Sequence, residues 1–269
     1  MKLQRYFIFL FFNVISLPFV YSQKDSLKIN RPYSICFSIS NNGQIDRSIN
    51  DFYRQNSEYL NSLFNTPQSQ QNEIKYNLSF LYSTNKGYSV GLKLGFQPIL
   101  FEYEIADDTR EIQANANQRI YNFNPAIGRF FSKNNFEFLL GLELPMFYVD
   151  NYVYNEIERN YRYSSSGVRE LQYITDNIIN INGGYVVGIN GFVKARYIIA
   201  NRFFISAEIS AGMMYSKVGD KFNQETTTVY YGTWFPGYPP NYVKNESDYT
   251  FKKTYFSSPE IGLGIGIKF

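Results

Sequence analysis

Bulky residues alternate with small or charged residues along much of the chain, and the period is two. The stretches with the clearest alternation are YSVGLKLGFQ (88–97), FEFLLGLELPMFY (136–148), FFISAEISAGMMY (203–215) and YFSSPEIGLGIGIKF (255–269), and in the last of these Tyr255 shares the apolar face with Ile261. Successive side chains of a strand point to opposite faces, so this pattern predicts β-strands. Each predicted strand has one apolar face and one face of small and charged residues.

Four weaker stretches with the same alternation bring the predicted number of strands to eight. They are SICFSIS (34–40), EIKYNLSFLYS (73–83), YNFNPAIGRFF (121–131) and GGYVVGINGFVKARYII (183–199). An even number of strands places both ends of a transmembrane barrel on the same side of the membrane.

The predicted connections alternate strictly between short and long. Short turns contain NKG at Asn85, SKNN at Ser132 and ANR at Ala200. The long connections are polar and aromatic and cover about 41–72, 105–117, 153–177 and 218–253. Alternating connections of this kind are typical of transmembrane barrels. We therefore predict an all-β fold: an eight-stranded antiparallel transmembrane β-barrel with short periplasmic turns and long extracellular loops. A soluble lipocalin-like or sandwich fold is the alternative.

Composition supports one strand-rich domain. Aromatic residues make up 19% of the 269 residues, and the mean hydropathy is −0.31 without an apolar run of the length of a spanning helix. The start of the chain has a basic, then apolar, pattern ending in Val20 and Ser22, which predicts a cleaved signal peptide over 1–22. A buried N-terminal strand or helix is the alternative. We expect a short periplasmic segment at 23–32 and the barrel at 33–269.

The parity of the predicted strands assigns nine charged residues to the inside of the barrel. An eight-stranded barrel is filled by side chains, and isolated buried charges are costly, so these residues are expected to pair. The predicted interior charges are Lys75, Lys93, Glu137, Glu143, Lys194, Arg196, Glu208, Glu260 and Lys268. Aromatic residues at strand ends, among them Tyr121, Phe131, Tyr148, Tyr197, Tyr215 and Tyr255, are candidates for interfacial girdles.

Three segments resemble the outer-membrane β-barrel proteins of Bacteroidota, including small porin-like, OmpA-like and OmpX-like barrels. The segments are NPAIGRFFSKNNFEFLLGL, ARYIIANRFFISAEISAG and PEIGLGIGIKF. The resemblance implies export to the outer membrane of a Gram-negative bacterium and contact with outer-membrane lipid. It also implies that Phe269 belongs to an assembly signal for the barrel assembly machinery.

The residue inventory argues against an enzyme. The chain has no histidine, which removes the common nucleophile pairs and His-dependent zinc sites, and Cys36 has no second cysteine to pair with. We expect no cofactor and no catalytic or metal site. Without Lys2 and Arg5, 24 basic residues oppose 23 acidic ones, and a net charge of +1 predicts no nucleic-acid partner. Glu102, Glu104, Asp107 and Asp108 suit either a calcium ion or a solvated loop.

The candidate binding site is the stretch YYGTWFPGYPPNY. Its aromatic residues are Tyr230, Tyr231, Trp234, Phe235, Tyr238 and Tyr242. Rigid aromatic loops suit binding surfaces, although a self-packed loop cap is the alternative. A second amphipathic stretch at 48–65 predicts a short helix, either packed on the loops or binding a partner.

The predicted function is non-enzymatic. We expect an integral outer-membrane barrel whose extracellular loops bind a protein or glycan partner, as an accessory subunit of an envelope complex. A small passive channel is the alternative, and it is disfavoured because eight strands leave little lumen. An enzyme acting on lipid is a third hypothesis, for which no spacing nominates a base.

Overall fold

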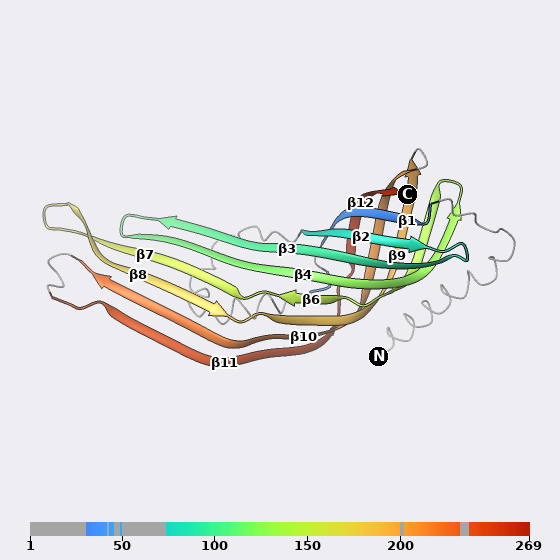
Figure 1. The fold of residues 1–269 in the computed structure, drawn as a ribbon. Coiled ribbons are helices and arrows are strands. Elements are labelled where there is room, and N and C mark those ends of the chain that lie inside the picture. The colour runs from blue at the N-terminus through green and yellow to red at the C-terminus, as the bar shows by residue number, and fades with distance from the viewer. Residues whose placement is uncertain (1–30, 42, 46–48, 50–73, 200–201, 232–236) are drawn as a thin grey trace, which may run out of the picture.

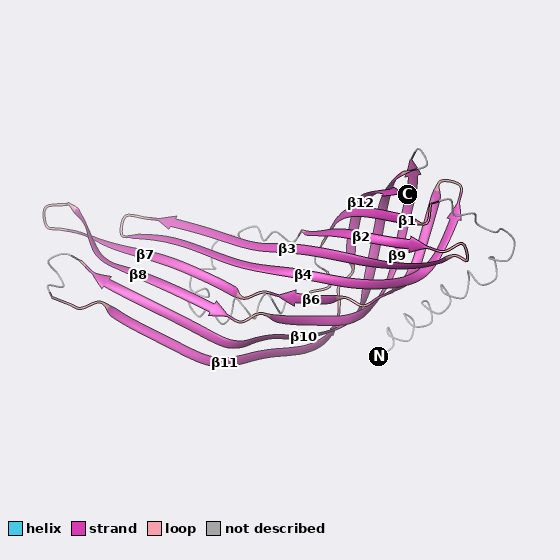
Figure 2. Cartoon of the chain, viewed as in Figure 1, coloured by secondary structure: helices cyan, strands magenta, loops and turns pink. Residues whose placement is uncertain are grey.

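The structure is a computed structural model that describes residues 31–41, 43–45, 49, 74–199, 202–231 and 237–269. Every element named in this part of the chain is a β-strand (Figure 2). The strands are β1 (Tyr33–Ser40), β2 (Lys75–Ser83), β3 (Tyr88–Ala106), β4 (Arg110–Lys133), β5 (Phe136–Glu143), β6 (Met146–Val149), β7 (Tyr152–Tyr163), β8 (Arg169–Ile181), β9 (Gly184–Ile199), β10 (Phe203–Tyr230), β11 (Asn241–Phe256) and β12 (Glu260–Lys268).

Eight of these strands close into a ring through antiparallel pairs. The order is β1-β2-β3-β4-β5-β9-β10-β12, and β12 pairs again with β1. At the closure the Tyr33 N–H donates to the Phe269 carbonyl at 3.1 Å, and the Phe269 N–H donates to the Tyr33 carbonyl at 3.0 Å. We refer to this paired circuit as the ring.

Six strands form a second region beyond the ring. In Figure 1, β3, β4, β7, β8, β10 and β11 run on side by side to the left, far past β1 and β2. We refer to residues 97–120, 152–181 and 217–254 as the extension. The expectation of long loops at 105–117, 153–177 and 218–253 was therefore wrong, because most of these residues form paired strands. The predicted loop at 41–72 lies largely outside the described residues.

Short interruptions divide some long strands without changing their course. β4 pairs in succession with β5, β6 and β7, and β10 pairs with both β9 and β8. Pro145 separates β5 from β6, since proline lacks the N–H that a ladder needs. Gly183 separates β8 from β9, where a Cβ atom would lie 1.9 Å from the Val149 carbonyl oxygen. Only glycine permits this approach of two backbones.

The interruption at 257–259 shifts the side-chain parity between β11 and β12. Tyr255 is buried and donates its hydroxyl to the Gln44 carbonyl at 2.9 Å, whereas Phe256 is exposed. The sequence pattern, which assumed one uninterrupted strand, placed Tyr255 on the outward face with Ile261. That assignment was wrong for Tyr255 and correct for Ile261, which is exposed.

The larger hydrophobic core lies on the inward face of the extension and of the adjoining parts of β6, β9 and β10. It includes Ala114, Ala116, Ile120, Phe147, Val149, Tyr152, Tyr154, Ile179, Ile181, Val186, Met214 and Val218, with Ile45 and Ile49. A smaller apolar cluster of Phe130, Leu139 and Phe192 lies inside the ring.

Candidate functional site

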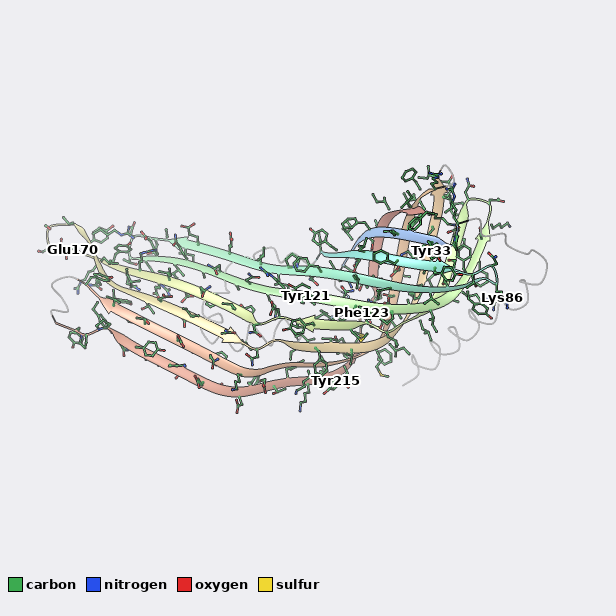
Figure 3. All side chains as sticks on the ribbon, in the orientation of Figure 1. Tyr33, Lys86, Tyr121, Phe123, Glu170 and Tyr215 are labelled. Atoms are coloured by element: carbon green, nitrogen blue, oxygen red, sulfur yellow. The ribbon has the colours of Figure 1, made fainter. Side chains whose placement is uncertain are left out.

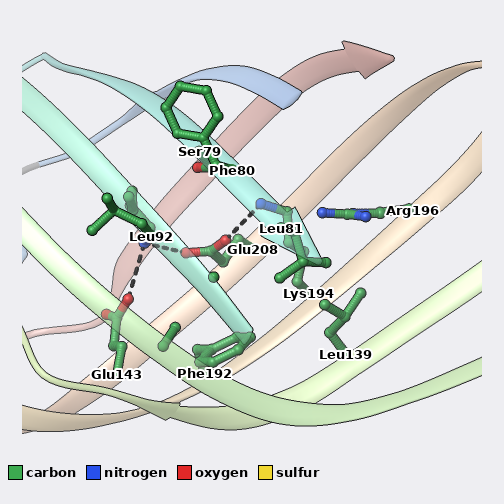
Figure 4. A pocket seen from close by; sticks show the side chains of 13 residues that line it. Ser79, Phe80, Leu81, Leu92, Leu139, Glu143, Phe192, Lys194, Arg196 and Glu208 are labelled. Atoms are coloured by element: carbon green, nitrogen blue, oxygen red, sulfur yellow. Dashed lines mark hydrogen bonds and ion pairs between the residues drawn. The ribbon is translucent and has the colours of Figure 1, made fainter. Parts of the chain in front are cut away.

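The ring interior contains a network of ion pairs centred on Lys93 (Figure 4). The Lys93 ammonium group contacts the Glu143 carboxylate at 3.2 Å and also pairs with Glu208. Glu208 in turn accepts from Lys194 at 3.0 Å. The four side chains come from β3, β5, β9 and β10, so the network ties together strands far apart in the sequence.

Two further groups of charges fill the interior on either side of this network. Lys75 of β2 pairs with Glu260 of β12. Lys268 of β12 pairs with Glu137 of β5, and the Arg196 guanidinium lies 4.0 Å from the same carboxylate. All nine side chains that parity assigned to the inside thus lie within the ring, each within 4.0 Å of an opposite charge.

Gln44 joins the network from the segment after β1, and no sequence pattern pointed to it. Its amide nitrogen donates to Glu143 and to the Ser210 hydroxyl, both at 2.9 Å. Gly43 allows this inward turn, since a Cβ there would lie 2.3 Å from the Pro259 carbonyl oxygen. Gln44 follows a strand and has no periodic neighbour, so alternation could not place it.

The outward face of the ring is apolar and ends in aromatic side chains on both sides. Toward the extension, aromatic contacts run from Phe96 to Tyr121 (5.4 Å between ring centroids) and from Tyr121 to Tyr148 (6.4 Å). Tyr185 and Tyr215 continue this row at 6.4 Å. Figure 3 shows Tyr121 and Tyr215 part-way along the molecule.

A second aromatic row marks the opposite end of the ring. The Tyr33 ring lies 5.1 Å from Tyr82 and 6.2 Å from Phe269, and the Phe136 ring lies 4.9 Å from Tyr197. The apolar outward face therefore lies between two rows of aromatic side chains.

Along β4, from the tip of the extension toward the ring, the inward face changes from apolar to polar and the outward face changes from polar to apolar. The change occurs at Tyr121, in the first aromatic row. The inward side chains of β4, from the tip of the extension toward the ring, are Ile112, Ala114, Ala116, Gln118, Ile120, Asn122 and Asn124. Its outward side chains in the same direction are Gln113, Asn115, Asn117, Arg119, Tyr121 and Phe123. The extension is apolar inside and polar outside, whereas the ring is polar inside and apolar outside.

The tip of the extension carries exposed aromatic side chains. Tyr173, Tyr230 and Tyr238 form a chain of ring contacts at 6.3 and 5.8 Å. Tyr238 is 63% exposed and Tyr242 is 57% exposed. Tyr231 is also exposed. The other two predicted aromatics, Trp234 and Phe235, lie outside the described residues.

Arg169 braces two hairpins at this tip. Its guanidinium donates to the carbonyls of Asp107 and Asp108 at 3.2 Å and pairs with Glu111 at 3.0 Å. It also stacks over the Tyr161 ring at 3.7 Å. These contacts connect the β3–β4 turn to the β7–β8 hairpin.

The inward face of the extension holds the buried carboxylate of Glu156, which no sequence pattern indicated. Glu156 accepts a hydrogen bond from the Tyr154 hydroxyl, and burial raises the pKa of its carboxyl group. Asn177 lies opposite it on β8 and accepts from Gln224 and Thr226, each at 3.1 Å. Glu156 belongs to a region predicted as loop, so its inward position was not visible.

The acidic residues near the β3–β4 turn do not form a metal cage. Among the described residues, no group of three or more Asp, Glu or Cys side chains is arranged to hold a metal ion. Asp107 instead accepts from the backbone N–H groups of Thr109 and Arg110 at 2.7 Å, and these bonds hold the pKa of its carboxyl group below the ordinary value. Cys36 is a buried free thiol.

The proposed signal peptide at 1–22 and the segment at 23–30 lie outside the described residues, as does the amphipathic stretch at 50–65. Within the described residues, no helix has both the length and the apolarity that crossing a bilayer requires.

Comparison with known proteins gives weak structural likenesses only. No protein-family model matches the chain, and no curated protein matches it. A major outer membrane protein from Thermus thermophilus is similar with a TM-score of 0.40 and 9% identity, over 89% of this chain and 100% of that one. CarO of Acinetobacter baumannii gives 0.30 and 11%, over 72% and 92%. The toluene transporter TbuX of Ralstonia pickettii gives 0.18 and 6%, over 90% of each chain.

Proposed function

We propose that the protein is an integral outer-membrane protein in which the ring is an eight-stranded transmembrane β-barrel. The observation that supports this most is the exchange of polar and apolar faces along β4. A strand wall surrounded by lipid needs apolar side chains outside, whereas a wall in water buries them inside. The exchange at Tyr121 is therefore the expected boundary between lipid and water.

The height of the apolar face fits a bilayer. Tyr185 and Tyr197 lie on the two aromatic rows and are 12 residues apart on β9. At about 3.3 Å per residue and a tilt of about 45°, this separation spans roughly 28 Å along the barrel axis. Transmembrane barrels have an apolar band of about 25 Å between aromatic girdles.

We infer further that the protein acts through its extension and not through an open lumen. Ion pairs and Gln44 occupy the ring interior, whereas the tip of the extension presents Tyr231, Tyr238 and Tyr242 to solvent. Exposed tyrosines are typical of binding surfaces. The expected partner is a protein or glycan of the cell envelope, and no chemistry within the ring nominates an enzymatic role.

The membrane proposal is tested by fractionation and gel migration. We expect the protein to stay with outer membranes during carbonate extraction and to migrate differently in SDS gels before and after boiling. Release by carbonate together with unchanged migration would replace the proposal with a soluble β-fold.

The partner proposal is tested by isolating the tagged protein from native outer membranes and identifying co-purified material. Replacement of Tyr238 and Tyr242 by alanine should reduce capture, and Trp234 and Phe235 are the next positions to test. Tyr88→Ala is the control, because Tyr88 is also an exposed tyrosine, 52% accessible, and begins β3 at the opposite end of the molecule. Capture that does not change in the tip variant would reject this site.

A passive channel is the second candidate, and the polar ring interior is the observation in its favour. Recording in a planar bilayer separates the two functions. Steady conductance steps from the unmodified protein would favour the channel over the partner-binding role.

A further inference from the structure

A groove of about 590 Å³ lies on the outward face of the ring. Neighbouring strands of the ring contribute to it, in the order β5, β9, β10, β12 and β1. Large side chains form its walls: Phe37, Phe136, Tyr197, Ile205, Leu263 and Ile265. Each of these side chains is at least 39% exposed, so the groove is open to the medium around the ring.

The floor of the groove is a pair of alanines. Ala207 of β10 lies directly opposite Ala195 of β9, and both residues line the groove. The next outward pair toward the short turns, Ile205 with Tyr197, has much larger side chains. The outward surface therefore recedes at the alanines. Side chains that border an empty space lose their contacts, so an apolar molecule from the medium is stabilised by filling the groove.

Two cations flank the end of the groove that is nearest the short turns. Lys133 lies directly opposite Phe136, which lines the groove, so the two side chains share the outward face. Arg202 lies in the turn between β9 and β10, and both cations are exposed. The two turns are neighbours, because the Ile198 N–H donates to the Asn135 carbonyl at 2.8 Å. A negatively charged group at this end of the groove would therefore meet two basic side chains.

No Asp or Glu opposes these cations in the stretches 131–136 and 198–206. The next carboxylate along the first stretch, Glu137, is buried inside the ring. The Phe269 carboxylate is close to the β9–β10 turn, but no ion pair joins it to either cation in the described part of the chain. The charge at this end of the groove favours an anionic ligand.

We propose that the groove binds one anionic glycerophospholipid, with an acyl chain over Ala195 and Ala207 and the phosphate group beside Lys133 and Arg202. This inference rests on the proposed placement of the ring in a membrane. In that placement the groove faces the acyl chains, and the aromatic row at its end marks the interface where the phosphate groups lie. Basic residues at this level attract anionic lipids.

The volume of the groove fits one acyl chain. A methylene group occupies nearly the volume of a water molecule in the liquid, about 30 Å³, so a chain of about 16 carbons needs roughly 480 Å³. Two such chains exceed the 590 Å³ of the groove. Lipid A carries several acyl chains and more than one phosphate group. A glycerophospholipid with one chain in the groove and the other in the bilayer therefore fits better.

The test uses the full-length protein reconstituted in vesicles of phosphatidylglycerol and phosphatidylcholine in equal amounts, with lipid A added in a separate arm. After extraction in mild detergent, native mass spectrometry counts the lipids that stay bound. We expect one phosphatidylglycerol to be retained at several times the occupancy of phosphatidylcholine. Equal retention of the two lipids, or preferred retention of lipid A, would overturn the proposal.

Substitutions in the floor and at the cations make the test specific. Ala207→Leu fills the floor and should lower lipid retention roughly tenfold. Ala211→Leu is the matched control, because it adds the same side chain to the outward face of β10 and does not line the groove. Lys133→Gln and Arg202→Gln should each lower the preference for phosphatidylglycerol roughly fivefold. Lys86→Gln, in the β2–β3 turn, should leave this preference unchanged.

The outcomes separate the lipid site from the membrane proposal. Lipid retention is measured on protein that stays with membranes in carbonate and migrates differently before and after boiling. Failure of those two assays would overturn both proposals, whereas protein that passes them but retains no lipid selectively would overturn the lipid site alone. An equal loss of lipid in Ala207→Leu and Ala211→Leu would also reject the groove. A mass of two chains that disappears in Ala207→Leu would mean that a second copy fills the groove instead of a lipid.

Discussion

The ring and the extension share β3, β4 and β10, but the apolar side chains point in opposite directions in the two regions. Inside the ring, charges such as Lys93 and Glu208 pair across the centre, and the outward side chains are aliphatic. Inside the extension, Tyr154 and Ile179 are buried, and the outward side chains are polar. In the proposed placement lipid surrounds the ring and water surrounds the extension, which would account for the opposite parity of their apolar side chains.

The largest effect is expected from removing Lys93, which lies at the centre of the ion-pair network in the ring. Lys93→Ala leaves two carboxylates, Glu143 and Glu208, without their shared cation. We expect a loss of about 3–5 kcal/mol, because breaking a buried pair leaves an uncompensated charge. The fraction that migrates as folded protein in unboiled SDS gels measures this loss. Lys86→Ala, in the exposed turn before β3, is the control, and an equal effect there would contradict the role of the network.

An arginine introduced on the outward face of β10 should lower stability more in the ring than in the extension. Ile209 lies midway between the aromatic rows and is 45% exposed, whereas Asn223 lies in the extension. Ile209→Arg should cost about 2–4 kcal/mol if lipid surrounds the ring. Asn223→Arg should change stability by less than about 0.5 kcal/mol. Chemical unfolding in lipid vesicles measures both, and similar values for the two variants would remove the lipid boundary.

The buried carboxylate of the extension predicts a smaller effect that depends on pH. Burial raises the pKa of Glu156 in the folded protein above its unfolded value. The folded state therefore binds the proton more tightly, and stability is greatest below the ordinary carboxyl pKa and falls as the pH rises through the folded pKa. Glu156→Gln should be more stable than the parent at neutral pH and should lack this dependence. Unfolding temperatures between about pH 4 and pH 8 test it, with Glu225→Gln as the exposed control.

The smallest effect is expected at the surface of the extension. Lys244 lies 2.8 Å from Glu246, and both side chains are largely exposed. Exposed pairs contribute little because water screens them. Lys244→Ala should leave the unfolding temperature unchanged at physiological salt. A loss similar to that of Lys93→Ala would mean that burial does not separate the two kinds of ion pair.

The ring strands could be predicted from the sequence because apolar side chains on one face alternate with small or charged side chains on the other. The alternation of Phe136, Phe138 and Leu142 with Glu137 and Glu143 is strong enough to fix parity without knowledge of the partner strand. From this parity, nine charged side chains were assigned to the inward face of the predicted strands. Parity failed at Tyr255, because an interruption of the strand changes parity and alternation alone does not reveal where an interruption lies.

The extension was missed for a different reason. In residues 112–120 the contrast is between alanine or isoleucine and asparagine or glutamine, and a polar, Asn-rich stretch also fits a loop. The exchange of faces at Tyr121 is nevertheless present in the sequence of β4 as a change of apolar parity. The position of Gln44 depends on contacts between distant strands, so it has no local signal in the sequence.

The length and pairing of β10 determine how the molecule would respond to a pulling force. β10 is continuous from Phe203 at one end of the ring to Tyr230 at the tip, 28 residues or roughly 90 Å, and it pairs with β8, β9, β11 and β12. A pull on the tip along the strands would load these ladders in shear, so many hydrogen bonds would share the force instead of breaking one after another. Force applied at the tip would therefore reach the ring through the ladders of β10.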